Sequence, residues 1–216
     1  DQFQRPQQMP LRTFKEVADQ HLKGVVTGIH LLPFFPYSSD DGFSVIDYSR
    51  VNPEWGDWDD ITRLGAEYRL MFDAVINHIS SESEWFKGFL RGEEPYKDFF
   101  INLPEGTDLA SVVRPRTSPL LTRFETDRGP QWVWTTFSAD QIDLNYKNPQ
   151  VLLKFVENLL FYVEKCAKLL RLDAVAYLWK EIGTTSIHLP QTHLVVSFLN
   201  ALFKEVAPSV LLVTET

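Results

Sequence analysis

The sequence has few of the features that mark secreted, membrane-spanning or nucleic-acid-binding proteins. Among its 216 residues there is one cysteine, Cys166, so a disulfide framework is excluded and a reducing compartment is favoured. No stretch reaches the roughly 18 consecutive apolar residues that a membrane-spanning helix needs. Lys and Arg number 21 against 29 Asp and Glu, and the net charge of −8 argues against a nucleic-acid partner. These absences predict a cytoplasmic protein that binds neither membranes nor nucleic acids.

Motifs for metal ions and nucleotide cofactors are missing as well. The five histidines stand at positions 21, 30, 78, 188 and 193, without the spacing of a tetrahedral metal site or of an EF-hand. No phosphate-binding loop and no dinucleotide glycine fingerprint occurs. The sequence therefore predicts chemistry carried by protein side chains, with no metal ion and no cofactor.

The chain is rich in core-forming residues, and its helical and strand-like segments alternate. Apolar residues make up 44% and aromatic residues 13% of the sequence. Strands are predicted in GVVTGIHLLPF, LMFDAVINH, LRLDAVAY and VLLVTET, and helices over Thr13–Lys23, Trp58–Tyr68, from Pro149 to about Leu170, and over Gln191–Ala207. Thr13 and Glu16 have the spacing of a capping box, and Asp57 and Asn148 are candidate N-caps. The alternation predicts a parallel sheet with helices outside it.

One long segment breaks this alternation. Between Ser80 and about Asn145 the periodicity fails, and proline, glycine, tryptophan and charged residues dominate. We interpret this segment as a small inserted domain. The predicted organisation is a first part over 1–79, an inserted domain over 80–145 and a continuation over 146–216.

Polar residues stand where three of the predicted strands end. Asp173 ends LRLD, Glu215 ends VLLVTE, and His78 ends MFDAVINH. Neighbouring strands lie about 4.8 Å apart, and a retaining glycosidase holds its two carboxyl groups about 5–5.5 Å apart. The pair Asp173 and Glu215 therefore indicates glycosyl transfer by double displacement.

Further side chains are candidates for roles near these carboxylates. Arg171 shares a strand face with Asp173, and its guanidinium is expected to lower the pKa of Asp173 and keep it ionised. Arg116, in the proline-stiffened stretch RPRTSP, is suited to bind a phosphate or carboxylate. For each of these residues the alternative is an ordinary structural or surface position.

Taken together, these segments resemble the α-amylase superfamily of glycoside hydrolases, family 13, and within it the sucrose phosphorylase subgroup. DAVINH, RLDAVAY and TET are similar to three short regions of that family, in the family order. The strings LLPFFPYSSDDGFSVIDY, WTTFSADQIDLNY and LWKEIGTTSIHLPQTH are similar to the branch that includes the glucosylglycerate and sucrose 6′-phosphate phosphorylases. The resemblance covers nearly the whole chain.

The resemblance implies a role for each matching residue. Asp173 would be the nucleophile and Glu215 the general acid/base, while Arg171 would orient Asp173. Asp47 and His78 would bind hydroxyl groups of the glucosyl ring. Two further residues are implied near the leaving group: Phe137 as an apolar wall beside the scissile bond, and Arg116 as an acceptor-side ligand for phosphate or glycerate.

The resemblance also implies the fold and the reaction. The fold would be an α/β (β/α)8 TIM barrel, of which strands 2 to 5 are present, with domain B inserted after the third strand. The activity would be transfer of glucosyl from an α-glucoside to inorganic phosphate, giving α-glucose 1-phosphate with retention. Since the family's fourth region falls after Thr216, we expect this chain alone to be inactive and the complete protein to be the enzyme.

Other functions stay open at this point. An α-glucosidase or transglucosidase would use the same two carboxylates with water or a sugar as acceptor, and a catalytically inactive sugar-binding barrel is a third possibility. The leaving group is equally open between glycerate, fructose 6-phosphate and fructose, and so is the oligomeric state.

Overall fold

The computed structural model describes residues 3–215, and its centre is a four-stranded parallel sheet. The strand order is β1-β2-β8-β9, and every neighbouring pair is parallel. The strands are β1 (Gly28–Leu31), β2 (Arg69–Val75), β8 (Ala167–Asp173) and β9 (Leu211–Thr214).

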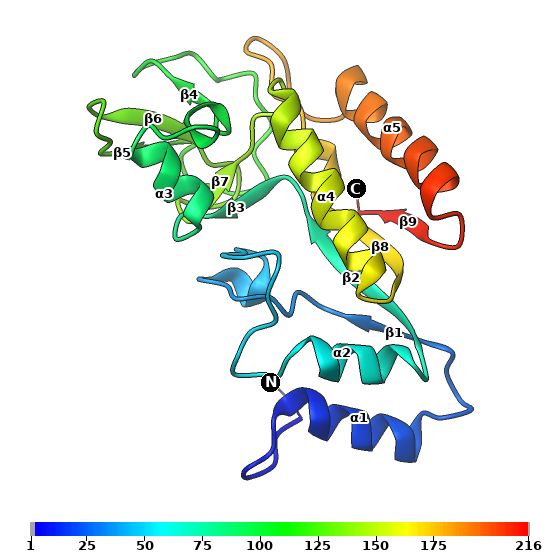
Figure 1. The fold of residues 1–216 in the computed structure, drawn as a ribbon. Coiled ribbons are helices and arrows are strands. Elements are labelled where there is room, and N and C mark those ends of the chain that lie inside the picture. Colours follow the sequence, from blue (N-terminus) through cyan, green and yellow to red (C-terminus); the bar gives the residue numbers. More distant parts are fainter. Residues whose placement is uncertain (1–2, 216) are drawn as a thin grey trace.

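A helix precedes each of the four strands along the chain. These helices are α1 (Pro10–His21), α2 (Trp58–Gly65), α4 (Pro149–Glu164) and α5 (Pro190–Val206). Figure 1 shows α2 beside β1, α1 on the other side of α2, and α4 and α5 beside β8 and β9. Four parallel strands that alternate with outer helices are half of the eight that close a (β/α)8 barrel. The predicted fold class is confirmed: the sheet is an open segment of such a barrel.

The segment between β2 and α4 carries short antiparallel sheets. β3 (His78–Ser80) pairs with β7 (Gln141–Asp143), and β6 (Gln131–Trp134) lies between β4 (Asn102–Leu103) and β5 (Leu121–Phe124). Helix α3 (Glu84–Leu90) and a 3₁₀ turn (Tyr96–Asp98) complete it. Val112, Leu120 and Trp134 form a separate apolar cluster there, but other parts of the segment share the main core. The domain boundaries at 80 and 145 stay a prediction.

Two local predictions at helix starts had different outcomes. Asp57 caps α2 as expected, because its side chain accepts from the Asp60 backbone N–H and the Asp60 carboxylate accepts from Asp57 N–H. Helix α1, in contrast, begins at Pro10, so Thr13 lies inside the first turns and cannot form the predicted capping box. Thr13 instead donates a hydrogen bond to Gln8 Oε1 at 2.9 Å. Proline at the first helical position outweighed the Thr13 signal.

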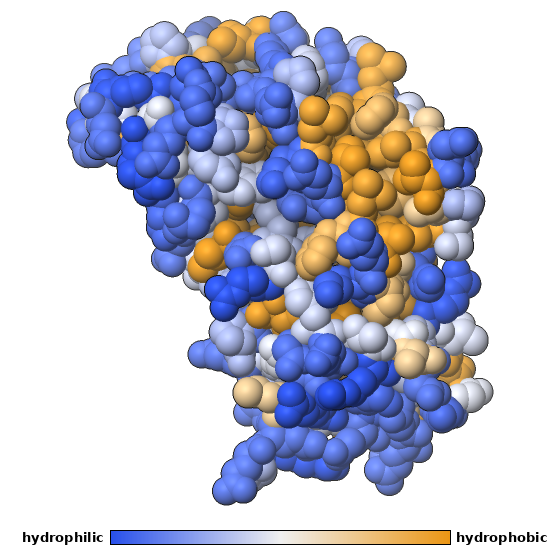
Figure 2. Space-filling model, viewed as in Figure 1, coloured by the Kyte–Doolittle hydropathy of each residue, from blue (hydrophilic) through white to orange (hydrophobic). Residues whose placement is uncertain are grey.

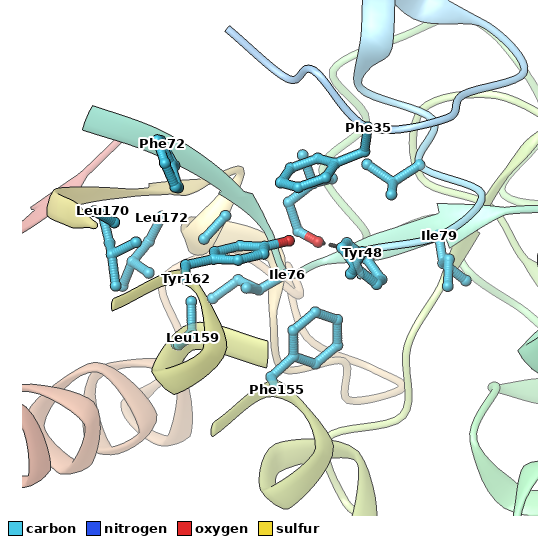
Figure 3. Packing of buried hydrophobic residues seen from close by; sticks show 14 of the residues in the cluster. Phe35, Tyr48, Phe72, Ile76, Ile79, Phe155, Leu159, Tyr162, Leu170 and Leu172 are labelled. Atoms are coloured by element: carbon cyan, nitrogen blue, oxygen red, sulfur yellow. Dashed lines mark hydrogen bonds between the residues drawn. The ribbon is translucent and has the colours of Figure 1, made fainter. Parts of the chain in front are cut away.

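The main core lies between the sheet and α4. Tyr162 of α4 stacks on Phe35, with ring centroids 5.1 Å apart and planes 15° apart, and also contacts Phe72 of β2 edge to face. Figure 3 shows Tyr162 between the β8 residues Leu170 and Leu172 on one side and Phe35 and Tyr48 on the other. This packing fixes β2 and β8, the strands that lead to the polar residues predicted above.

The outer surface carries an apolar area over the last two long helices. Figure 2 shows it where Figure 1 places α4 and α5. Leu153 of α4 is 52% exposed, and Leu194 and Phe198 of α5 are 68% and 44% exposed. Helix α4 is apolar on more than one face: Val151, Phe155, Leu159 and Tyr162 are buried, while neighbouring apolar residues stay partly exposed.

Candidate active site

The sheet register brings the two predicted catalytic carboxylates to neighbouring strand ends. Asp173 is the last residue of β8, and Glu215 directly follows β9. Leu172 pairs with Thr214 in the parallel ladder, so the chain leaves both strands at the same level. On the other side of β8, Val75 of β2 pairs with Asp173, and the chain continues from there to His78. Three consecutive strands of the sheet therefore deliver polar side chains to one edge.

Arg171 connects the carboxylates of three strands. Its Nη1 lies 2.5 Å from Asp73 Oδ1 and 3.2 Å from Asp173 Oδ1, and its Nη2 lies 3.4 Å from Glu215 Oε1. The predicted contact between Arg171 and Asp173 is present in the structure. Asp73 is the partner that sequence reasoning missed; the register Asp73↔Arg171 places it directly opposite on β2. Its signal in the sequence was a charged residue inside an apolar strand.

Asp73 is fully buried and has a second partner on the next strand. Its Oδ2 lies 2.7 Å from His30 Nε2, and His30 belongs to β1. The side chains of His30, Asp73 and Arg171 thus form a polar row across β1, β2 and β8. A buried carboxylate needs such partners, because leaving it unpaired in a low-dielectric interior costs several kcal/mol.

The environment of Asp173 raises its pKa to about 7. Burial is the largest cause, because it disfavours the charged carboxylate, and the negative charge of Glu215 adds to it. Arg171 acts in the opposite direction but does not prevail. The expected lowering by Arg171 is therefore present but outweighed, because the guanidinium is shared among three carboxylates and Asp173 is only 7% exposed.

Glu215 is held beside Asp173 by the backbone of Ala174, the residue that follows Asp173. The Ala174 N–H donates to Glu215 Oε2 at 3.0 Å. Ala174 has φ +49°, in the left-handed region that non-glycine residues seldom adopt. Such strained backbone persists only where the surroundings impose it, and it is frequent at functional sites. The turn after β8 thus has a strained backbone at Ala174, and this conformation directs the Ala174 N–H toward Glu215.

A cavity of about 530 Å³ opens at these strand ends. Asp173, Glu215 and Arg171 line it together with three other residues predicted from the sequence, His78, Phe137 and Arg116. Lining residues that the sequence analysis did not single out for a site are Asp40, Asp41, Gln141, Tyr177, Ile187 and His188. The structure therefore gathers six of the seven predicted site residues at one cavity.

Asp47 is the exception, because it does not line this cavity. Its Oδ1 accepts from the backbone N–H and the hydroxyl of Ser49. Its neighbour Tyr48 is buried and donates to the carbonyl oxygens of Val75 and His78, which turns Asp47 away. Asp40, from the same loop, lines the cavity, while the ring-binding role implied for Asp47 stays a prediction.

The loop that carries Asp40 has a strained and closely packed backbone. Asp40 and Asp41 have φ of +55° and +50°. Gly42 follows with φ +104°, and a Cβ at this position would lie 2.7 Å from the Pro33 carbonyl oxygen, so only glycine fits. Asp40 Oδ2 accepts from Gln141 Nε2 at 2.9 Å, which connects this loop to β7.

Two hydrogen bonds orient the ring of His78. Its Nε2 donates to the Phe43 carbonyl oxygen at 3.0 Å, and its Nδ1 accepts from the Asn77 side-chain amide at 3.2 Å. Burial lowers the pKa of His78, so the neutral ring is favoured. A neutral imidazole with fixed orientation is suited to bind a polar ligand rather than to carry charge.

A buried ion pair between Lys180 and Asp143 contacts Asn77, which in turn bonds to His78. Lys180 Nζ lies 2.6 Å from Asp143 Oδ2 and donates to Asn77 Oδ1 at 2.7 Å. Asp143 also accepts from the Thr136 N–H and hydroxyl. Burial lowers the pKa of Lys180, although Asp143 opposes this effect. The pair joins β7, the turn after β2 and the segment after β8 beneath the cavity.

A second carboxylate, Asp140, joins the loops around the cavity. Asp140 accepts hydrogen bonds from the hydroxyls of Ser38, Ser39, Ser44 and Ser81. These hydrogen bonds lower its pKa, although partial burial alone would raise it. One side chain therefore fixes the loop after β1 against the segment after β3.

Aromatic rings form one wall of the cavity. Phe137 lies between His78 and Tyr177, with ring centroids 5.2 Å and 5.4 Å away. Both residues line the cavity. Phe137 lies in the segment before β7, and Tyr177 belongs to the 3₁₀ turn Val175–Tyr177. Such a wall is suited to the apolar face of a sugar ring.

Arg116 contributes a positive charge to the lining of the cavity. The ion pairs formed among residues 3–215 do not include Arg116. Arg171, in contrast, is occupied by three carboxylates. A cation without an anionic partner at a cavity is a candidate ligand for a bound anion.

The described residues contain no candidate metal cluster and no candidate membrane-spanning helix. Within residues 3–215, no cluster of three or more His, Cys, Asp or Glu side chains is arranged to hold a metal ion. None of the described helices is long and apolar enough to cross a membrane. Cys166 lies in the turn between α4 and β8, and partial burial raises its pKa.

Comparison with known proteins gave matches over most of the chain. The sequence model of the family "Alpha amylase, catalytic domain" matches residues 20–216. The chain is 57% identical over its full length to a glucosylglycerate phosphorylase of Spirochaeta thermophila and 51% identical to one of Escherichia coli. It spans 37% and 39% of the lengths of these relatives.

A solved structure agrees with these sequence matches. The crystal structure of sucrose 6F-phosphate phosphorylase from Thermoanaerobacter thermosaccharolyticum superimposes with a TM-score of 0.88 at 29% identity. The superposition covers 95% of this chain and 45% of that protein. The similarity thus extends over nearly the whole chain.

Proposed function

Because the chain belongs to the α-amylase catalytic-domain family, we propose that the complete protein containing it is a retaining glucoside phosphorylase. The donor is glucosylglycerate, the acceptor is inorganic phosphate, and the products are glucose 1-phosphate and glycerate. One observation carries the proposal: Asp173 and Glu215 share Arg171 at a cavity that Arg116 also lines. The names of the relatives that are 51–57% identical support this choice of donor.

In the first step of the proposed reaction, Asp173 attacks the anomeric carbon of the glucosyl ring. Glu215 gives its proton to the glycosidic oxygen, so glycerate leaves with that proton and a covalent glucosyl-Asp173 ester remains. Arg171 holds both carboxylates in register while the charge on Asp173 disappears. The Ala174 N–H, at 3.0 Å from Glu215, compensates the negative charge that develops there as its proton leaves.

In the second step, a phosphate oxygen attacks the same anomeric carbon and displaces Asp173. Glu215 now takes the proton of the incoming phosphate, and two inversions give net retention. Phosphate competes with water at a concentration far below that of water, so the site must bind it specifically. Arg116 is the group that supports this preference, because its guanidinium has no carboxylate partner within residues 3–215.

The glucosyl ring is proposed to lie against the wall formed by His78, Asp40 and Gln141. Asp40 belongs to this wall because it lines the cavity, and Asp47 stays a predicted ligand of the same ring. Phe137 provides the apolar surface beside the scissile bond. In this proposal the segment 80–145 is the inserted domain that supplies Arg116 and Phe137. The single cysteine favours a reducing compartment, such as the cytoplasm, for the reaction.

The test is phosphate release from glucose 1-phosphate by the complete protein. Glycerate, fructose 6-phosphate and fructose are offered separately, and we expect release with glycerate and little with the two others. Asp173→Asn is the matched control, since it preserves shape but removes the nucleophile. It should lower the rate by several orders of magnitude.

Two outcomes would overturn the proposal. Release with fructose 6-phosphate or fructose alone would keep the phosphorylase and replace the donor. Hydrolysis of an activated α-glucoside without phosphate release from any acceptor would identify a glucosidase that uses the same carboxylates.

A further inference from the structure

The wall of the cavity that contains Arg116 is built from two loops that are tied together. Val113 N–H donates to the Thr185 carbonyl oxygen at 2.9 Å, and the Ser111 hydroxyl donates to the Thr184 carbonyl oxygen at 3.0 Å. Three residues beyond this tie, one loop reaches Arg116 and the other reaches His188. Both side chains line the same cavity. The tie therefore places a guanidinium and an imidazole on one wall.

His188 has a conformation that local preferences do not explain. Its φ is +53°, in the left-handed region that non-glycine residues seldom adopt. Its backbone N–H donates to the Ala176 carbonyl oxygen at 2.9 Å, inside the turn that follows Asp173. Its ring stacks on His193 of α5, with centroids 6.2 Å apart and planes 15° apart. The strained backbone and the stacked ring together hold the imidazole in one place beside the cavity.

The charges on this wall differ from those at the strand ends. Asp173, Glu215 and Asp73 already surround Arg171. Within residues 3–215, neither Arg116 nor His188 forms an ion pair. Arg116 and His188, two exposed side chains that carry N–H donors, line a cavity of about 530 Å³, which has room for an anion beside a sugar ring.

We propose that His188 is a specificity-determining residue that forms, together with Arg116, an anion site for the carboxylate or phosphate of the acceptor. This inference rests on the proposed function and deepens it. In a double displacement with retention, the departing glycerate and the incoming phosphate occupy the same side of the anomeric carbon. One anion site can therefore receive the glycerate carboxylate in one step and phosphate in the other. A neutral acceptor of the same size lacks the group that this site binds.

The experiment compares glycerate with glycerol, which lacks only the carboxylate charge and its oxygens. The complete protein and its His188→Asn variant are assayed for phosphate release from glucose 1-phosphate with each acceptor. Asparagine tolerates the left-handed backbone, so the loop keeps its shape. We expect kcat/KM for glycerate to fall about 10- to 100-fold, the loss of one charge-assisted hydrogen bond. For glycerol, and for hydrolysis of α-glucosyl fluoride, we expect a change of less than about twofold.

Control variants separate recognition from structural damage. His21→Asn changes an exposed histidine on α1, outside the cavity, and should leave all rates unchanged. His188→Lys supplies an N–H donor again and should recover part of the glycerate activity. An equal loss for glycerate and glycerol in His188→Asn would show a structural role and overturn the proposal.

A binding measurement keeps this inference distinct from the proposed function. Calorimetric titration of the resting protein with D-glycerate and with inorganic phosphate requires no turnover. We expect His188→Asn to weaken binding of both anions about tenfold or more. Unchanged affinities would overturn the anion site even if phosphorolysis is confirmed. Weakened affinities in a protein that releases no phosphate would instead overturn the proposed function and support the anion site.

Discussion

At the scale of single residues, one guanidinium contacts three acidic side chains. Arg171 contacts Asp73, Asp173 and Glu215, which come from β2, β8 and the end of β9. Burial and then the charge of Glu215 raise the pKa of Asp173 to about 7. Asp173 must be ionised to attack, so its ionisation should govern the acidic side of the pH profile.

This coupling predicts a pH shift. For α-glucosyl fluoride, kcat/KM of the complete protein should rise with pH through an apparent pKa near 7, because only ionised Asp173 attacks. Glu215→Gln removes the neighbouring negative charge, so the pKa of Asp173 should fall and the rise should occur at lower pH. Fluoride needs no proton to leave, and the variant therefore keeps a measurable rate. The measurement is fluoride release against pH.

Glu205→Gln is the control for this experiment. Glu205 is an exposed carboxylate on α5, and its substitution should leave the profile unchanged. An unshifted profile in Glu215→Gln would contradict the charge coupling between Glu215 and Asp173.

The sequence predicted which charged residues matter better than it predicted their pKa. Alternation along a strand is enough to place Arg171 and Asp173 on one face, and the structure confirms their contact. The direction of the Asp173 shift depends on burial and on Glu215, which is 42 residues away along the chain and adjacent only through the β8–β9 ladder. Asp40 was missed for a related reason, since backbone strain at Asp40 and Gly42 directs that carboxylate to the cavity.

At the scale of elements, two tyrosines in the same core differ in whether their hydroxyl groups form hydrogen bonds. Tyr48 donates to the carbonyl oxygens of Val75 and His78 at 2.9 Å and 2.8 Å, and so closes the corner between β2 and β3. Tyr162 packs α4 onto the sheet, but its buried hydroxyl has no partner within the described residues. Figure 3 shows both rings in the same cluster.

The difference predicts opposite effects of the same substitution. Tyr162→Phe should leave stability unchanged or raise it by about 1 kcal/mol, because a buried unpaired hydroxyl disappears. Tyr48→Phe should lower stability by about 1–3 kcal/mol, because a bonded hydroxyl is lost and two buried carbonyl oxygens lose a donor. Chemical denaturation of the complete protein measures both. Equal losses in the two variants would show that the Tyr162 hydroxyl is satisfied in solution.

Element type was predictable from local signals, whereas element partners were not. The Asn148–Pro149 pair marked the start of α4 and the Asp57 box marked that of α2. The buried row of α4, which contains Val151 and Phe155, follows from packing against the sheet rather than from helical periodicity alone. Likewise, the pairing of β3 with β7 joins segments about 60 residues apart, and no local pattern indicates it.

At the scale of the whole molecule, the sheet is open. Within residues 3–215 the outer edges of β1 and β9 have no strand partner, and apolar side chains such as Leu194 and Phe198 are exposed on α5. Unpaired edges and large apolar surfaces promote association. The 216-residue chain also spans 37–39% of the length of its phosphorylase relatives.

The chain expressed alone is therefore expected to associate and to lack activity. Size-exclusion chromatography with light scattering should show species larger than a monomer, and phosphate release from glucose 1-phosphate with glycerate should be absent. The complete protein, measured in parallel, is the control. A monomeric chain with measurable turnover would contradict this prediction and would show that residues 1–216 form a self-sufficient catalytic unit.

The tie between the two loops of the anion site has a consequence for engineering. Ser111 and Val113 bond to backbone oxygens of Thr184 and Thr185, so the junction does not depend on which side chains stand at 184 and 185. Each loop therefore depends on hydrogen bonds from the other for its position. A graft that exchanges only one of them for the loop of a related enzyme would leave the other without its support. Acceptor preference should therefore transfer between relatives only when 111–116 and 184–188 are transplanted as one cassette.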